Sequence, residues 1–172
     1  MAAMLGSGSK LCVRPGKASD AAALSGVFRE SWLFAYRGII PHLHLESMVR
    51  QRTPEWWRTA VKSGDSILVL EHAGKVVGYA TFGTPRQRGP FQGEIYELYL
   101  DPVCQGVGFG EHLFEASRHA LDMRKLRGLV VWALLDNTPA CDFYWRRGGR
   151  PVASSFTKIG GTKLEKVAFT WR

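Results

Sequence analysis

The sequence has few cysteines, and the three that occur lie far apart, at Cys12, Cys104 and Cys141. An odd number without a C-x-x-C pair indicates neither a disulfide framework nor a zinc site. Long hydrophobic runs are also missing: none approaches the roughly 18 to 20 apolar residues that cross a bilayer, and residues 1–5 are too short for a signal-peptide core. We therefore expect a soluble, cytoplasmic protein with reduced thiols, no resident metal and no membrane partner.

Acidic residues are scarce relative to basic ones, since 15 Asp and Glu stand against 23 Lys and Arg and leave a net charge of +8. Such a chain attracts anions, whether a phosphate-rich cofactor, a nucleic acid or an acidic partner. No helix-turn-helix, RNP or zinc-finger signature accompanies the charge, so a nucleic acid is not the expected partner. The arginine clusters at residues 86–88, 124–127 and 146–150 are interpreted as solvated surface.

The length of 172 residues, 45% of them hydrophobic, suffices for one domain with a core and is short for two. Residues 1–10 are rich in Gly and Ser and are expected to form a flexible N-terminal tail. The predicted domain therefore spans residues 11–172.

Strands are predicted where apolar or β-branched residues run together between turn signals, and helices where apolar residues recur at helical spacing. The strands are expected over residues 11–14, 67–71, 76–84, 94–100, 129–135, 152–159 and 164–171. The helices are expected to begin near Ser19 or Asp20, at Thr53, at Glu111 and at Asn137. Pro41 is expected to open a less regular region.

The order strand, helix, strand over residues 94–135 favours a right-handed crossover between parallel neighbours. Turn signals at residues 73–75 and 160–161 instead favour antiparallel hairpins. The predicted fold is therefore α/β: a mixed, mostly antiparallel sheet of about six or seven strands with a central parallel β-α-β crossover, flanked by about four helices.

A glycine-rich turn lies between the predicted strand 94–100 and the helix from Glu111. Glycines let the backbone approach an anion, and the first N–H groups of a helix lack partners within it, so the turn predicts a cradle for a pyrophosphate-bearing ligand. The Lys-Ser or Lys-Thr of a Walker loop is missing after Gly110, and so is the G-x-G-x-x-G spacing of a dinucleotide fingerprint. The cradle consists of Gln105, Gly106, Val107, Gly108, Phe109 and Gly110.

Within the cradle, Gln105-x-x-Gly108-x-Gly110 resembles the acetyl-CoA-binding motif of the GNAT acetyltransferase superfamily. A second match lies downstream, at the spacing of that family's Asn-x-x-Ala-x-x-x-Tyr-x-x-x-Gly segment, in Asn137, Ala140, Tyr144 and Gly148. Two motifs in the right order are far more specific than either alone. The resemblance runs from about residue 11 to the C-terminus and weakens between residues 37 and 66. One departure is Gly149, where the family usually has Phe.

The resemblance implies an acyltransferase: an acetyl-CoA-dependent N-acetyltransferase that moves an acetyl group to a primary amine of a small molecule or peptide by direct transfer in a ternary complex. Acetyl-CoA is then a co-substrate, and no metal takes part. The resemblance also implies that main-chain groups of Leu98 and Leu100 hold the acetyl carbonyl and the pantetheine arm. Residues 105–110 would hold the pyrophosphate, and Asn137 would reach the pantetheine amides.

An alkylammonium has a pKa of about 10.4 in water, so a general base or a desolvated site must remove its proton before attack. Glu94 lies eleven residues before Gln105, the spacing of the catalytic glutamate in histone-type members, and Glu97 has a position that often faces the acceptor. Strict alternation puts them on opposite strand faces, which a bulge would change; solvent-facing structural residues are the alternative. Tyr144 matches the tyrosine that many members use to protonate the leaving thiolate, with core packing as its alternative.

The identity of the acceptor is left open, because polyamines, aminoglycosides, amino acids and protein amines all fit such a fold. A basic chain disfavours polycationic acceptors unless Glu46, Glu55, Glu94 and Glu97 line the pocket. A homodimer through the final strands is an assembly that the resemblance allows. A non-catalytic acyl-CoA-binding or sensor module, which would bind the cofactor without acetylating any amine, is the alternative function.

Overall fold

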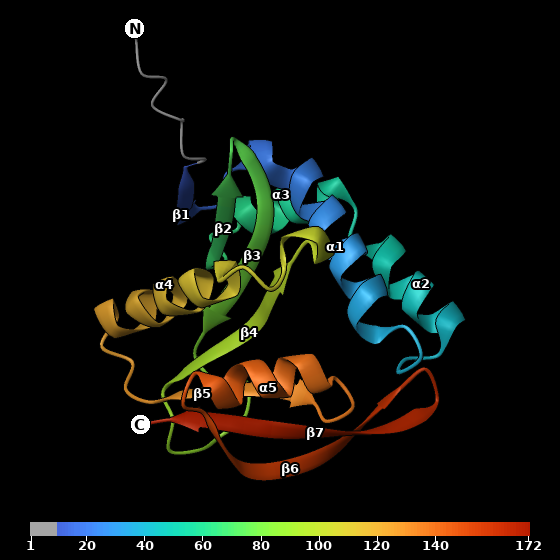
Figure 1. Ribbon diagram of the computed structural model, residues 1–172, viewed down its shortest axis with the longest axis vertical. Helices are drawn as coiled ribbons and strands as arrows, with labels where there is room; N and C mark the ends of the chain where they lie inside the picture. Colours follow the sequence, from blue (N-terminus) through green and yellow to red (C-terminus); the bar gives the residue numbers. More distant parts are fainter. Residues whose placement is uncertain (1–9) are drawn as a thin grey trace, which may run out of the picture.

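Seven strands form one sheet in the computed structural model, which describes residues 10–172 (Figure 1). They are β1 (Leu11–Pro15), β2 (Ile67–His72), β3 (Lys75–Gly83), β4 (Gly93–Leu100), β5 (Leu129–Leu134), β6 (Arg150–Ile159) and β7 (Thr162–Trp171). Their order is β1-β2-β3-β4-β5-β7-β6, and only β4 and β5 are parallel. The predicted mixed α/β sheet is confirmed. Of the predicted flexible tail, residues 1–9 lie outside the described residues.

Five α-helices cover the two faces of this sheet in the described chain: α1 (Ala21–Tyr36), α2 (His42–Gln51), α3 (Pro54–Lys62), α4 (Phe109–Met123) and α5 (Thr138–Arg146). The first three share a buried cluster with Tyr79 of β3, and the other two share clusters with the opposite face. The expectation of a less regular region after Pro41 is wrong. Helix α2 forms there because Leu45 and Val49, one turn apart, are both buried in the first cluster.

Both predicted hairpins are present, and glycine-containing turns close them. The β2–β3 turn places Ala73 and Gly74 at φ 51° and 78°, and the β6–β7 turn places Gly160 and Gly161 at φ 59° and 80°. Two successive left-handed residues match the right-handed twist of the flanking strands, so these short turns set the register of each hairpin.

The parallel contact between β4 and β5 is very short. Only Gly93 pairs with Leu129, and Glu94 with Val130, before the two strands diverge (Figure 1). Beyond that point β5 keeps its pairing with β7, while β4 keeps its pairing with β3. The later main-chain groups of β4 on the β5 side are therefore not committed to that neighbouring strand.

A β-bulge interrupts β4 between the two candidate glutamates. Thr81 of β3 stands opposite Glu97, but the next residue, Phe82, stands opposite Ile95, which leaves Tyr96 as the extra residue. The register then sets Glu94 opposite Gly83, two positions from Thr81. Because side chains alternate along a strand, the bulge places Glu94 and Glu97 on the same face.

The departure from the family pattern at Gly149 has a packing reason. A Cβ atom there would lie 2.5 Å and 2.7 Å from two ring carbons of Trp171 and 2.9 Å from the Tyr144 carbonyl oxygen. The Trp171 indole, whose Nε1 donates to the Arg147 carbonyl oxygen over 3.0 Å, fills this space. We infer that glycine is required because the indole packs directly on the backbone.

Gly149→Ala should therefore lower the free energy of unfolding by about 1–3 kcal/mol, the usual cost of overpacking a close contact. The matched control is Gly26→Ala in α1, where a Cβ meets nothing within 4 Å and alanine should be neutral or stabilise the helix. Chemical denaturation of the two variants checks this. An unchanged midpoint for Gly149→Ala would show that Trp171 does not close on this position.

Candidate active site

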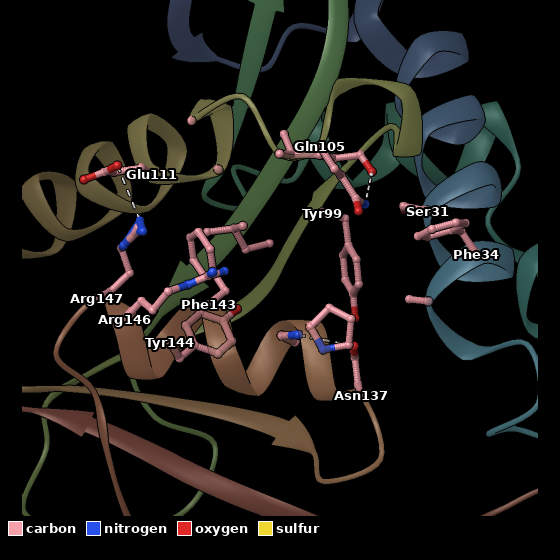
Figure 2. A pocket seen from close by; sticks show the side chains of 18 residues that line it. Ser31, Phe34, Tyr99, Gln105, Glu111, Asn137, Phe143, Tyr144, Arg146 and Arg147 are labelled. Atoms are coloured by element: carbon pink, nitrogen blue, oxygen red, sulfur yellow. Dashed lines mark hydrogen bonds and ion pairs between the residues drawn. The ribbon is translucent and has the colours of Figure 1, made fainter.

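A cavity of about 570 Å³ opens where β4 leaves β5 (Figure 2). Figure 2 shows α5 along one side, Gln105 on the opposite side and α1 on a third side. Of the predicted site residues, those that line the cavity are Leu98, Leu100, Gln105, Gly106, Gly108, Gly110, Asn137 and Tyr144. The structure thus brings together the strand, turn and helix segments that the two sequence motifs singled out.

The glycine turn makes an open helix N-terminus at this cavity. Gly106 and Gly108 have φ 79° and 88°, and Gly108 is the N-cap residue of α4 without a side-chain cap. The Gln105 side chain turns back and donates from Nε2 to the Leu100 carbonyl oxygen over 3.4 Å, which ties the turn to β4. Main-chain N–H groups with no side chain in front of them fit a pyrophosphate.

Two residues of the predicted cradle do not line the cavity. Val107 is exposed, and the Phe109 ring packs against the His72 ring with centroids 4.9 Å apart. Their side chains therefore do not face a ligand in the cavity, so any contact that they make in the cradle comes from their main-chain groups. That role stays a prediction.

Helix α5 supplies the facing wall. Ala140, Phe143, Tyr144 and Arg147 follow the i, i+3, i+4, i+7 spacing of one helix face, and all four line the cavity. Asn137 is the N-cap of α5 and accepts from the Ala140 N–H over 3.4 Å, so it is held at the cavity by the helix that it caps.

Arg146 and Arg147 also line the cavity, although their cluster was interpreted as solvated surface. Arg147 pairs with Glu111 of α4 at 3.4 Å (Figure 2). The helical spacing of Arg147 from Tyr144 and Ala140 is the sequence signal that could have found it. The two guanidinium groups add positive charge beside the open helix N-terminus, which suits a phosphate-bearing ligand further.

Three tyrosines meet near this cavity. The Tyr36 and Tyr99 hydroxyls lie 2.5 Å apart, and Tyr99 lines both this cavity and a second one. Burial raises the pKa of Tyr144, with the neighbouring Tyr36 and Cys141 acting in the same direction. The Tyr144 hydroxyl therefore stays protonated at neutral pH.

The second cavity, of about 710 Å³, lies between α3, β2, β3 and β4 and contains Glu97. The Glu97 carboxylate accepts hydrogen bonds from Tyr79 Oη at 3.0 Å, Arg52 Nη1 at 3.3 Å and Thr81 Oγ1 at 3.4 Å. The Arg52 guanidinium lies 4.0 Å from the centre of the Trp56 ring. Glu97 is thus a fixed carboxylate in a cavity that shares the Tyr99 wall with the first.

Glu94 has a different environment. Its side chain is 1% exposed, and it lines neither cavity described above. One carboxylate oxygen accepts from Arg86 Nη2 at 2.7 Å and Nε at 3.2 Å, and the other from the Arg86 main-chain N–H at 2.8 Å. Glu94 therefore anchors the loop after β3, a structural task that occupies both oxygens.

The described residues contain no group of three or more His, Cys, Asp or Glu side chains arranged to hold a metal ion. Within the same part of the chain, no helix is long and apolar enough to span a membrane.

Known proteins share sequence similarity with this chain. The profile of the acetyltransferase (GNAT) family matches residues 27–148. An uncharacterized N-acetyltransferase, YuaI of Bacillus subtilis, is 28% identical over 92% of this chain and 91% of its own length. A mycothiol acetyltransferase of an Arthrobacter species is 32% identical over 78% of this chain, which spans 43% of that protein.

A solved structure shows the same fold. It is the PaiA N-acetyltransferase of Thermoplasma acidophilum in complex with coenzyme A, with a TM-score of 0.73 and 19% identity over 92% of this chain and 98% of that one.

The Arg86–Glu94 contact predicts that Glu94 is needed mainly for stability. Glu94→Gln removes the buried charge and turns an amide N–H₂ toward the donors of Arg86, so the free energy of unfolding should fall by about 1–3 kcal/mol. Glu115→Gln, on the exposed side of α4, is the control and should change it by less than about 0.5 kcal/mol. Equal stability of the two variants would show that the buried pair contributes nothing.

Proposed function

Because this chain belongs to the acetyltransferase (GNAT) family and is an acyltransferase, we propose that it is an acetyl-CoA-dependent N-acetyltransferase that transfers acetyl directly to a primary amine of a small molecule or peptide. One observation carries the proposal: two cavities meet at Tyr99, and one is lined by the glycine turn while the other holds a fixed carboxylate. A cofactor and an acceptor can thus approach each other from two sides without a covalent enzyme intermediate. The cytoplasm is the expected location, because the three cysteines are free thiols.

The first cavity is proposed to bind the co-substrate. Main-chain N–H groups of residues 105–110, with Arg146 and Arg147, would hold the pyrophosphate, while Asn137 and the main chain of Leu98 and Leu100 would hold the pantetheine arm. Acetyl-CoA supplies the thioester carbonyl that the amine attacks. Donors that the diverging strand leaves free near Leu98 would stabilise the charge that develops on that carbonyl oxygen.

The second cavity is proposed to bind the acceptor, with Glu97 rather than Glu94 as the group that takes the proton. Glu97 lines this cavity, whereas Glu94 is buried beside Arg86 and lines neither cavity. Burial raises the pKa of Tyr79 well above its usual value, so this hydroxyl stays protonated and holds the Glu97 carboxylate in place. As the amine nitrogen bonds to the acetyl carbon and the carbon–sulfur bond breaks, Tyr144 would donate its proton to the sulfur, and the second proton that the nitrogen loses would restore the Tyr144 hydroxyl through solvent.

Glu97→Gln should lower kcat/KM for the amine by about 10²- to 10⁴-fold, the usual contribution of a positioned base. The defect should shrink as the pH approaches the pKa of the free amine, because deprotonated acceptor then forms without the enzyme. Steady-state rates from pH 6 to 10 measure both effects, and calorimetry should show unchanged affinity for acetyl-CoA. If the Glu97→Gln variant had the same pH profile as the wild type, Glu97 would not be the group that takes the proton.

Tyr144→Phe should reduce kcat about ten- to a thousandfold, because a positioned acid contributes on that order. The phenyl ring keeps the packing of Tyr144 against Phe114 and Phe169, so the thermal unfolding midpoint should hardly change. Turnover equal to wild type, with the same midpoint, would make Tyr144 a packing residue only.

The proposed reaction is tested by initial rates with acetyl-CoA and a panel of primary amines varied together. Direct transfer predicts double-reciprocal lines that intersect, whereas a covalent acetyl-enzyme predicts parallel lines. Binding of acetyl-CoA without acetylation of any amine would contradict the proposal and favour the non-catalytic module.

A further inference from the structure

The second cavity is unusually rich in cationic donors for a site that takes an amine. Arg52, Arg86 and Arg124 all line it. Arg52 is paired with Glu97, and Arg86 with Glu94. The structure gives Arg124 a neutral partner instead, since its Nη2 donates to Ser66 Oγ over 2.7 Å. A guanidinium whose observed acceptor is a hydroxyl still has N–H groups and charge to offer an anion.

A second donor is present in the same cavity. The Trp57 side chain is fully buried and lines the cavity, and its Nε1 has no hydrogen-bond partner among residues 10–172. A buried unsatisfied N–H is costly, so an acceptor oxygen that reached this indole would be stabilised there.

The acidic side chains that a polycationic acceptor would need lie elsewhere. Glu46 pairs with His42 at 3.4 Å, and Glu55 pairs with Arg58 at 3.8 Å. Of the four glutamates considered from the sequence, only Glu97 lines the second cavity, where exposed Asp65 is the other carboxylate. With Glu94, which pairs with Arg86, three carboxylates balance the three guanidiniums, so the lining has no net negative charge to hold a second ammonium group of the acceptor.

The charges are also separated along the cavity. Arg124 lies 5.3 Å from the Phe82 ring centre, and Arg86 lies 4.8 Å from the Tyr96 ring centre. Burial and the Glu94 charge raise the pKa of Tyr96, while the charges of Arg86 and Arg124 oppose that rise, so both guanidiniums lie within electrostatic reach of one hydroxyl. Glu97 is held at Tyr79 and Thr81 instead, beside the Tyr99 wall that faces the cofactor cavity.

We propose that the acceptor is a primary amine that also carries a carboxylate, as an amino acid does. Its amine faces Glu97 and Tyr99, and its carboxylate is held by Arg124 with help from Arg86. The inference rests on the proposed acetyl transfer and narrows its acceptor. It excludes polyamines, whose second ammonium group would lie among the arginines.

The test compares L-amino acids with their carboxamides, their decarboxylated amines and spermidine, with CoA release as the readout. The acids should have kcat/KM at least about tenfold above each matched carboxamide or decarboxylated amine, the usual effect of a charge-assisted contact. Calorimetric titration of the same compounds into the CoA-loaded protein gives a second readout without turnover. Preference for the neutral amides or for spermidine in either readout overturns the proposal.

Two variants of Arg124 test whether this residue causes the preference for a carboxylate. Arg124→Gln should reduce the ratio of kcat/KM for the acid to kcat/KM for the carboxamide by about tenfold, whereas Arg124→Lys should keep part of the ratio. Arg88→Gln, in the same loop as Arg86 but outside the cavity lining, is the control and should match wild type. An unchanged ratio in Arg124→Gln overturns the assignment of the carboxylate to this arginine.

The outcomes separate this inference from the proposed function. Protein that fails to bind acetyl-CoA contradicts the proposed function, whatever the acceptor. Protein that acetylates other amines from acetyl-CoA but shows no preference for the carboxylates contradicts the acceptor class alone.

Discussion

The short pairing of β4 with β5 is the constraint on which the rest of the structure depends. Two residue pairs hold the strands together, after which β5 follows β7 and β4 follows β3. A continuous ladder would have used the main-chain groups of Leu98 and Leu100 and closed the space between the strands. Because the strands diverge instead, the glycine turn, α1 and α5 can meet around a cavity, with Tyr99 between that cavity and the next.

An aromatic cluster packs against the helix that begins at the glycine turn. Phe114 of α4 contacts the rings of Phe143, Tyr144 and Trp171, so aromatic side chains from two helices and the last strand pack together. Burial of large aromatic groups is among the strongest stabilising contributions in a core. The same contacts place Tyr144 at the cavity and require glycine at position 149, so fold and site are stabilised together.

Much of this arrangement could be predicted from the sequence because its signals are local. These signals are the turn residues of the two hairpins, the apolar run of β5 and the two spaced motifs, each of which lies within a few residues. The structure has the corresponding elements. Helix α2 was missed because it follows Pro41, has no capping side chain and is stabilised by tertiary burial of Leu45 and Val49.

The division of tasks between the two glutamates could not be predicted, since it depends on contacts across the fold. Arg86, in the loop after β3, forms an ion pair with Glu94. Arg52, at the end of α2, donates a hydrogen bond to Glu97, 45 residues away in sequence. The bulge at Tyr96 puts both glutamates on one face, but long-range partners decide which faces a cavity. The roles of the site residues, and assembly through the exposed edge strand β6, stay predictions.

The central claim is that main-chain N–H groups of the glycine turn grip a pyrophosphate and so hold the thioester at the opening between β4 and β5. Its most direct measurement is a calorimetric comparison of coenzyme A with pantetheine, which keeps the thiol arm and lacks the pyrophosphate. Several charge-assisted hydrogen bonds to the phosphates predict that coenzyme A binds at least about a hundredfold more tightly. Affinities equal within about threefold would contradict the account.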